Sequence, residues 1–340
     1  MQLGATGSAG VPVTLPAGRW SATGRLGWSD GSTTGTCPVS STAVTVVPRT
    51  TWASGASGAG VGDGTFGTWR GSPATVAGTW ADDPDASLGL WQLRSGGEYG
   101  RWTGDLDIAV GAIGSGETWA AAARGAYDAR WRQSLQTMAQ LWAGRPGQLH
   151  IRFAHEFNGD WYPWSVTAAS VADFRTAWQR YRALQQQVFP GASLVFSPNS
   201  DTASSAGLDW RTAFPGAQYV DVLAVDYYNQ YPWTGTAADF TALSLAYDRF
   251  GAPRGLQRHA EFAASVGLPF AVAEWGANAD AGDSAVFVEQ MQAFFAAHAG
   301  DGPGQLRYEV FFNVVWDGNP WALYPSTRSP RAAEAYRRLF

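Results

Sequence analysis

The chain has 340 residues and a net charge of −5, with 15% charged residues, 14% aromatic residues and 18 tryptophans. This acidic balance, without any run of lysine or arginine, argues against a nucleic acid or an anionic membrane as partner. No stretch approaches the roughly 20 continuous apolar residues of a membrane span. Flat amphipathic rings are surfaces on which sugars stack, so part of the tryptophan content fits a carbohydrate platform, although any single tryptophan can equally belong to the core.

The cellular compartment is not fixed by the cysteine content. Cys37 is the single cysteine, so it cannot form an internal disulfide. The first residues lack the basic and apolar regions of a signal peptide. We expect a secreted protein whose signal peptide was removed or lies outside this chain.

The first 64 residues differ in composition from the rest of the chain. Short β-like runs at residues 11–15, 20–28 and 43–47 are separated by Gly, Ser, Asp and Pro. They predict a small β-rich N-terminal appendage over residues 1–50, which packs against the main body or is the remnant of a larger β module. Residues 51–64 have the composition of a Gly/Ser-rich linker, although a loop lying over the main body would look the same.

From residue 65 onward strand-like runs alternate with helix-like runs, which predicts an α/β fold with a parallel sheet. The eight strand candidates are Phe66–Arg70, Val76–Trp80, Leu106–Ala112, Leu149–His155, Ser193–Pro198, Tyr219–Tyr227, Pro269–Trp275 and Tyr308–Trp316. Amphipathic helices are predicted at Ala120–Gly144, Val171–Val188, Leu256–Val266, Ser284–His298 and Pro330–Phe340. A closed barrel of eight such units takes about 250 residues. We therefore expect a catalytic (β/α)8 TIM barrel over residues 65–340.

One stretch, Ile151–Trp164, combines an apolar strand with an ionisable end. The strand ends on His155-Glu156, and Asn-Gly and three aromatic residues follow. Strand ends of such a barrel carry the functional groups, so Glu156 is the first catalytic candidate. A structural ion pair between Glu156 and Arg152 is the alternative. A zinc site is the weaker interpretation, because the second histidine of a His-Glu-x-x-His helix is missing.

A second stretch, Pro269–Gly276, repeats this design, with an apolar strand that ends on Glu274 and continues with Trp275. Strands four and seven lie on roughly opposite sides of a barrel rim, so two carboxyl groups there can face each other across a bound sugar. Hydrolysis of a glycoside needs one protonated and one ionised carboxyl group. A separation of about 5–5.5 Å between them would indicate a retaining mechanism. The other acids at strand ends are Asp82, Asp83 and Asp226.

Four motifs in barrel order resemble those of glycoside hydrolase family 26, which is best known for endo-β-1,4-mannanases. They are Arg152…His155-Glu156-x-Asn158-Gly159-x-Trp161-Tyr162-x-Trp164, Ser197-Pro198-Asn199, Tyr219-Val220-Asp221…Asp226-x-Tyr228 and Glu274-Trp275-Gly276. The resemblance spans roughly residues 65–340 and is loose in the N-terminal third, including residues 67–69 and 80–83. It implies that Glu156 is the acid/base and Glu274 the nucleophile.

The same resemblance suggests further roles. His155 is similar to a histidine that contacts the sugar next to the cleavage point, Trp161 to a stacking aromatic, and Trp316 to the aromatic floor beneath the sugar. Tyr228 corresponds to the tyrosine that holds the nucleophile. The candidate substrate-binding residues are His155, Trp161, Asn199, Asp226, Tyr228, Trp275 and Trp316. Two alternatives stay open: Tyr228 and Asp226 can form a buried network at the rim, and Asn199 can be a turn residue.

The leading interpretation is a retaining endo-glycoside hydrolase that acts on a polysaccharide, foremost β-1,4-mannan. No metal or other cofactor is expected, and the chain is expected to work as a monomer. The alternatives are the same machinery on mixed-linkage β-glucan, β-1,3-xylan or a less common glycan, with endo or exo action. A further alternative, from another class, is a non-catalytic carbohydrate-binding barrel.

Overall fold

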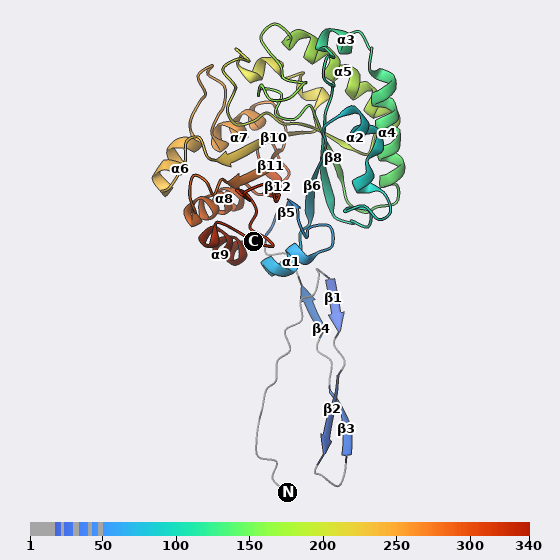
Figure 1. Ribbon diagram of the computed structural model, residues 1–340, viewed down its shortest axis with the longest axis vertical. Helices are drawn as coiled ribbons and strands as arrows, with labels where there is room; N and C mark the ends of the chain where they lie inside the picture. The colour runs from blue at the N-terminus through green and yellow to red at the C-terminus, as the bar shows by residue number, and fades with distance from the viewer. Residues whose placement is uncertain (1–17, 22–23, 30–33, 40–42, 47–49) are drawn as a thin grey trace.

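The computed structural model describes residues 18–21, 24–29, 34–39, 43–46 and 50–340 (Figure 1). In the N-terminal part, β1 (Gly18–Ser21) pairs antiparallel with β4 (Ala43–Val46), and β2 (Gly24–Ser29) pairs antiparallel with β3 (Thr34–Val39). The predicted β run at residues 11–15 lies outside the described residues. The described segments before residue 47 are thus β structure, and the appendage as a domain stays a prediction.

Eight parallel strands close into a barrel in the order β10-β11-β12-β5-β6-β7-β8-β9. Their bounds are β5 Ala53–Gly58, β6 Val76–Ala81, β7 Asp105–Val110, β8 Leu149–Phe153, β9 Ser193–Phe196, β10 Val222–Asn229, β11 Phe270–Ala277 and β12 Leu306–Asn313. The last strand pairs with the first, since Tyr308 of β12 lies opposite Ala53 of β5. The predicted (β/α)8 barrel is confirmed.

Helices surround the strands in the connections between them (Figure 1). They are α1 Thr65–Arg70, α2 Pro84–Gly89, α3 Trp119–Ala123, α4 Asp128–Trp142, α5 Val171–Val188, α6 Ala237–Ser244, α7 Leu256–Ser265, α8 Ala285–His298 and α9 Pro330–Leu339. Short 3-10 turns lie at Trp91–Leu93, Trp210–Ala213 and Ala217–Tyr219. The predicted helix at 120–144 is divided into α3 and α4 around Gly125, whose φ of 87° a helix cannot continue through.

The start of the barrel differs from the prediction. The first strand is β5, which lies inside the stretch interpreted as a linker or loop, and the predicted strand Phe66–Arg70 is the helix α1. The reason is steric, because β5 passes very close to β6. A Cβ at Gly55 would lie 1.6 Å from the carbonyl oxygen of Val76. Glycine is therefore required at position 55, and the strand sequence Ala-Ser-Gly-Ala-Ser-Gly resembles a flexible linker in composition. The other seven strand predictions are confirmed, with ends shifted by a few residues.

The barrel has two apolar layers. Inside, small and branched residues such as Val76, Ala224 and Val310 pack around Tyr308. Outside, a larger aromatic-rich core fills the space between strands and helices and includes the buried Trp131, as the helical spacing predicted. Burial of this apolar area is the main stabilising term of the fold. It holds the strand ends in fixed positions at the rim.

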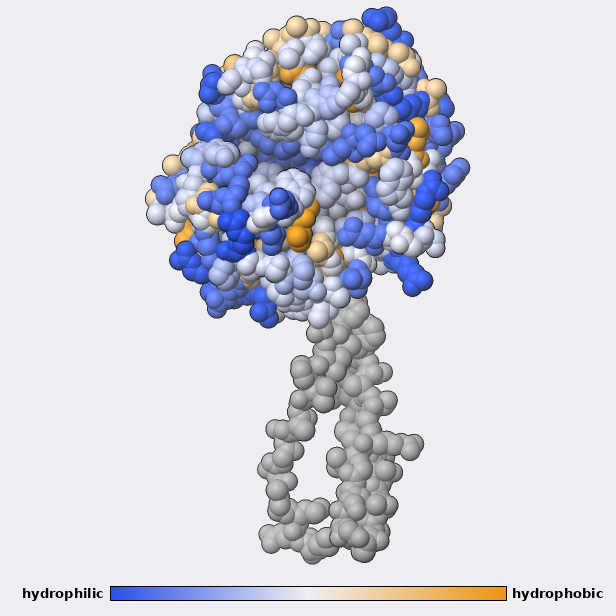
Figure 2. All heavy atoms as spheres, in the orientation of Figure 1, coloured by the Kyte–Doolittle hydropathy of each residue, from blue (hydrophilic) through white to orange (hydrophobic). Residues whose placement is uncertain are grey.

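On the face shown in Figure 2, most residues of the barrel are hydrophilic and hydrophobic residues form only small patches. None of the helices that the structure describes combines the length and the apolar character needed to cross a lipid bilayer.

Candidate active site

A cleft of about 750 Å³ opens at the C-terminal ends of the barrel strands. Its lining combines carboxylates, aromatic rings and small polar groups. The lining residues are Trp80, Asp82, Glu156, Trp161, Tyr162, Asn199, Ser200, Asp201, Thr202, Ala203, Ser204, Tyr228, Gln230, Tyr231, Arg249, Glu274, Phe312, Val314, Trp316 and Trp321. They come from six of the eight strand ends, so the whole rim except the ends of β5 and β7 contributes to the site.

The backbone that delivers Glu156 leaves the barrel in an unusual conformation. Strand β8 ends at Phe153, after which Ala154 and Glu156 have positive φ angles of 55° and 50°. Side chains with a Cβ rarely occupy this region, and each such residue costs roughly 1 kcal/mol. Two backbone hydrogen bonds hold the segment, because the Ala154 N–H donates to the Val110 carbonyl and the Glu156 N–H donates to that of Ser197. The neighbouring strands thus aim the Glu156 carboxyl group into the cleft.

Glu156 is surrounded by neutral hydrogen-bond donors. The Asn199 side-chain amide donates to Oε1 at 2.6 Å, and the Trp161 indole donates to Oε2 at 3.0 Å. Burial, followed by the negative charge of Glu274, raises the pKa of Glu156 above its ordinary value, although these hydrogen bonds act in the opposite direction. No salt bridge holds Glu156 among the described residues. This environment favours the protonated acid.

Glu274 has a different set of partners. Its Oε1 accepts hydrogen bonds from the Trp80 indole and from Nη2 of Arg152, both at 2.8 Å. Its Oε2 accepts from the Tyr228 hydroxyl at 2.6 Å. Burial alone would raise the pKa of Glu274, but the positive charge of Arg152 and the donors around the carboxyl group outweigh it. The pKa therefore lies below its ordinary value, and Glu274 is ionised at neutral pH.

Arg152 lies fully buried inside the barrel and binds three carboxyl groups. Its Nε donates to Asp107, its Nη1 donates to both oxygens of Asp226 at 3.1 and 3.0 Å, and its Nη2 donates to Glu274. The interpretation of Arg152 as the partner of Glu156 is therefore wrong, because the side chain points across the barrel. One cation cannot balance three carboxylates, and burial raises the pKa of both Asp107 and Asp226. Glu274, the most exposed of the three, retains the negative charge.

The sheet is irregular where these groups meet. The register between β10 and β11 shifts between Val225 and Asp226, so that Asp226 lies opposite Glu274. A bulge of this kind changes the direction of the side chains that follow it and is common beside active sites. Tyr228, two residues further along β10, points to the same side as Asp226 and reaches Glu274.

His155 lies directly behind the cleft. Its ring is buried, and its Nε2 lies 2.9 Å from Oδ1 of Asp82, which follows strand β6. Burial lowers the pKa of His155, but the adjacent Asp82 carboxylate outweighs burial and raises it overall. The ring lies against Tyr162 and Trp164, whose own rings stack at 4.2 Å. The Asp82 carboxylate thus favours the protonated, positively charged form of His155.

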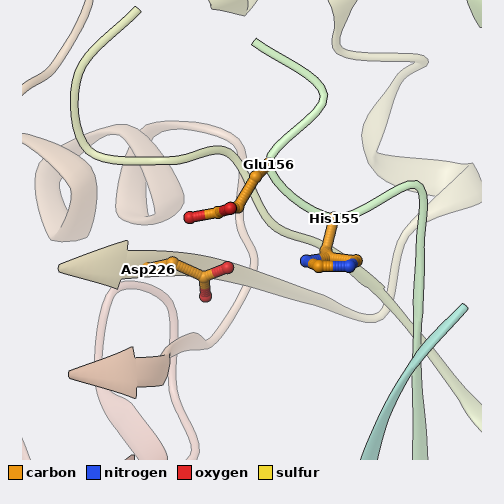
Figure 3. A group of neighbouring side chains, drawn as sticks. All are labelled: His155, Glu156 and Asp226. Carbon is orange, nitrogen blue, oxygen red and sulfur yellow. The ribbon is translucent and has the colours of Figure 1, made fainter. Parts of the chain in front are cut away.

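His155, Glu156 and Asp226 each offer one atom within 4.8 Å of the others, a spacing that could hold a metal ion. In Figure 3 the carboxyl groups of Glu156 and Asp226 approach each other, with the His155 ring to one side. Their donor atoms already have protein partners, since Asp226 binds the Arg152 guanidinium and His155 binds Asp82. A second cation beside Arg152 would be repelled. The residues therefore fit a metal poorly.

The structure brings most of the predicted site residues together. Glu156, Glu274, Trp161, Asn199, Tyr228 and Trp316 line the cleft. His155 and Asp226 lie directly behind it and are buried. Trp275 was predicted wrongly as a substrate contact. Its ring faces the helices, packs against Phe311 and donates its indole N–H to Glu309.

Several site residues were not singled out from the sequence. Trp80 binds Glu274, and Phe312 packs against Trp80 at 5.4 Å. Tyr231 and Arg249 lie on loops that follow β10 and α6, where no pattern in the sequence indicates the cleft. Trp80 could have been found, because it stands at the end of a predicted strand, as Glu156 and Glu274 do.

Two carboxyl groups at strand ends of a (β/α)8 barrel, in a cleft lined by aromatic rings, form the arrangement expected of a glycoside hydrolase. Comparison with known proteins makes this class more specific. Residues 143–294 match the model of glycosyl hydrolase family 26. Endoglucanase H of Acetivibrio thermocellus is 27% identical over 212 residues, which cover 60% of this chain and 21% of that protein. The chain thus spans about a fifth of the length of this curated relative.

Solved structures show the same fold. The catalytic domain of a Bacillus sp. JAMB-750 endo-β-1,4-mannanase superposes with a TM-score of 0.55 at 16% identity, covering 80% of this chain and 78% of that one. A modular endo-β-1,4-mannanase from Cellulomonas fimi gives 0.58 at 16% identity, with 84% and 70% covered. The resemblance to glycoside hydrolase family 26 is confirmed, and glycosidase is the class of enzyme that these comparisons support.

Proposed function

We propose that this protein is a retaining endo-acting glycoside hydrolase, with Glu156 as the acid/base and Glu274 as the nucleophile. The opposite environments of the two carboxyl groups carry this proposal. Glu156 has neutral donors and a raised pKa, whereas Glu274 has Arg152 beside it and a lowered pKa. These opposite shifts favour a proton on Glu156 and a negative charge on Glu274, as double displacement requires.

In the first step, a Glu274 carboxylate oxygen attacks the anomeric carbon while the bond between that carbon and the leaving oxygen breaks. Glu156 transfers its proton to the leaving oxygen, and a covalent glycosyl ester forms on Glu274. Oε2 of Glu274 suits the attack, because it has one hydrogen-bond donor while Oε1 has two. Tyr228 and Arg152 hold the carboxylate in place throughout.

In the second step, the ionised Glu156 removes a proton from a water molecule whose oxygen attacks the anomeric carbon. The ester bond to Glu274 breaks, the carboxylate is restored, and the product keeps its anomeric configuration. Glu156 ends protonated, so the enzyme returns to its starting state. The side chains of Asn199 and Trp161 can follow both charge states, since each donates to a Glu156 oxygen.

For the substrate we propose β-1,4-mannan, because the motifs around both carboxyl groups resemble those of mannanases. The second candidate is a β-glucan, which the name of the curated relative favours. The exposed rings of Trp161 and Trp316, at 52% and 58% exposure, offer stacking surfaces for either chain. The protein is proposed to be secreted, monomeric and independent of a metal ion.

The test is a product analysis after incubation with mannan, mixed-linkage β-glucan and β-1,3-xylan, with the Glu274→Ala protein as control. We expect short manno-oligosaccharides from the intact protein alone. Proton NMR of the first products should show the β anomer before mutarotation. Cleavage of glucan but not mannan would make β-glucan the substrate in place of mannan. An α anomer as first product would exclude the retaining mechanism.

A further inference from the structure

The two ends of the cleft differ in chemistry. The general acid must stand beside the leaving oxygen, whereas the nucleophile lies beneath the sugar that is attacked. Around Glu274, the lining is aromatic and consists of Trp80, Phe312, Trp316 and Trp321. We call this the aromatic half. Beyond Glu156, the lining is polar and consists of residues 200–204, Gln230, Tyr231 and Arg249. We call this the leaving-group half.

The leaving-group half is attached to the segment that carries the general acid. Asn199 donates to Glu156, and residues 200–204 follow it directly in the chain. The side chain of Asn158 fixes this loop by donating to the Asn199 carbonyl and to the Thr202 hydroxyl, and its backbone carbonyl accepts from the Ala203 N–H. The loop is therefore held rigidly relative to Glu156.

Two further loops complete this half. Arg254 forms a salt bridge with Asp201 at 2.8 Å and also donates to the backbone carbonyl of Tyr231, so it ties the loops after β9 and β10 together. The Tyr231 ring is left 81% exposed. Arg249 stands on a turn shaped by Asp248, whose carboxylate accepts two backbone N–H groups, and its Nη1 donates to the Ser204 hydroxyl at 2.6 Å.

The charges of the lining leave Arg249 uncompensated. Asp201 is paired with Arg254, Asp82 with His155, and Glu274 with Arg152. Burial raises the pKa of Glu156, which favours its uncharged form. Among the described residues of the lining, Arg249 is the only lysine or arginine, and its Nη1 donates to a hydroxyl group rather than to a carboxylate. The cleft of an acidic chain thus contains one available positive charge, on the leaving-group side.

A neutral sugar does not require a cation, whereas a carboxylate matches the planar pair of N–H donors of a guanidinium. We propose that Arg249 selects substrates in which the sugar on the leaving-group side carries a carboxylate, as a uronic acid does. Tyr231 provides the adjacent ring for stacking. This proposal rests on the proposed function, because it takes Glu156 as the group that marks the leaving-group side.

The test compares neutral manno-oligosaccharides with the same oligosaccharides oxidised at C6 to carboxylates. We expect the wild-type protein to have a higher kcat/KM on the oxidised set at low ionic strength, and added salt to reduce that preference. Arg249→Gln should lower kcat/KM on both sets, but about tenfold further on the oxidised set, which corresponds to one strong hydrogen-bonded charge contact. Arg249→Lys, which keeps the charge, should restore part of the preference.

Arg338→Gln is the matched control, because Arg338 is an exposed arginine of α9 outside the cleft. The Arg338→Gln substitution should leave kcat/KM unchanged on both the neutral and the oxidised oligosaccharides. An equal fall on the two sets for Arg249→Gln, or no preference in the wild-type protein, would overturn the proposal.

Binding measured by calorimetry separates this proposal from the proposed function. If neither set is cleaved, the proposed hydrolysis of β-1,4-mannan is contradicted. Tighter binding of the oxidised oligosaccharides that is lost in Arg249→Gln would still support the role of Arg249. Equal or absent binding of the two sets would refute it.

Discussion

Glu156 and Glu274 occupy similar positions in the barrel, yet their surroundings give them opposite acidities. Both lie at the C-terminal rim of the barrel, both are buried, and both accept a hydrogen bond from a tryptophan indole. The remaining donor is a neutral amide for Glu156, whereas Glu274 has a guanidinium and a tyrosine hydroxyl. Burial raises the pKa of a carboxyl group unless a cation offsets it. Arg152 binds Glu274 and not Glu156, so its position separates the pKa values of the two groups.

The largest expected effect comes from replacing Glu274, the carboxyl group beside Arg152. Glu274→Ala should lower kcat on polysaccharide by about 10⁴-fold or more, because no carboxylate remains to attack the anomeric carbon. Azide should restore turnover and yield a glycosyl azide of inverted configuration. Rates measured with and without azide check this, and a variant that retains substantial activity without azide would show that another group is the nucleophile.

Replacing Glu156, whose hydrogen-bond donors are neutral, should have an effect that depends on the substrate. Glu156→Ala should lower activity on unactivated polysaccharide by about 10²- to 10⁴-fold, the usual contribution of a general acid. Substrates with a good leaving group, such as dinitrophenyl glycosides, need little protonation and should still form the glycosyl-enzyme at close to the wild-type rate. Stopped-flow measurement of phenol release tests this. Equal losses on both kinds of substrate would contradict the acid/base assignment.

A smaller change tests how the lowered pKa of Glu274 arises. Tyr228→Phe removes the hydrogen bond to Oε2 and should raise the pKa of Glu274, since the lost donor stabilised the ionised form. The acidic limb of the kcat/KM profile should move to higher pH, with a loss of about 10- to 100-fold at the optimum. Tyr227→Phe is the control, because this neighbouring hydroxyl is buried, has no hydrogen-bond partner among the described residues and belongs to a ring that stacks on Phe287. Unchanged profiles for both variants would contradict the role of Tyr228.

A third carboxyl group shows that a raised pKa alone does not make a catalytic acid. Glu309 lies between β12 and the helices, accepts a hydrogen bond from Trp275 and is fully buried, and burial raises its pKa to about 7. In the unfolded chain it would titrate near 4.5. The folded protein thus binds the proton more tightly, and stability should fall as the pH rises from about 4.5 to 7 and level off above that.

Glu309→Gln should remove this part of the pH dependence, which is on the order of 3 kcal/mol. The variant should leave kcat almost unchanged, because the side chain lies outside the cleft. Urea unfolding at pH 5 and pH 8 measures the difference. If the wild-type protein loses no more unfolding free energy between pH 5 and pH 8 than the variant does, Glu309 does not titrate as described.

The sequence predicts some parts of this molecule well and others poorly, for physical reasons. Strand β11 contains an apolar run and β8 alternates apolar with polar residues, and each is followed closely by a glutamate at the rim, so both strands and both glutamates are readable. Strand β5 is composed of small residues because Gly55 touches β6, and local composition cannot separate it from a linker. Trp275 follows Glu274 in a strand, so the alternation of side chains already predicts that it faces away from the cleft.

Partners that are far apart in the chain were not predictable. Arg152 lies four residues before Glu156 but binds Glu274, 122 residues away. That choice depends on the closure of the barrel and on the bulge that places Asp226 beside Glu274. The acidities of the two glutamates follow from this contact, so the resemblance could suggest their roles but the residues alone could not.

The central claim is that Glu274 forms a covalent bond to the sugar while Glu156 does not. The most direct measurement is incubation with an activated 2-deoxy-2-fluoro-mannoside, followed by peptide mapping with mass spectrometry. Fluorine at C2 slows both steps, and the good leaving group allows the first to proceed, so the glycosyl-enzyme accumulates. We predict one added sugar on the peptide that contains Glu274, and none in Glu274→Ala. A label on another residue, or turnover to an inverted product without any label, would contradict the account.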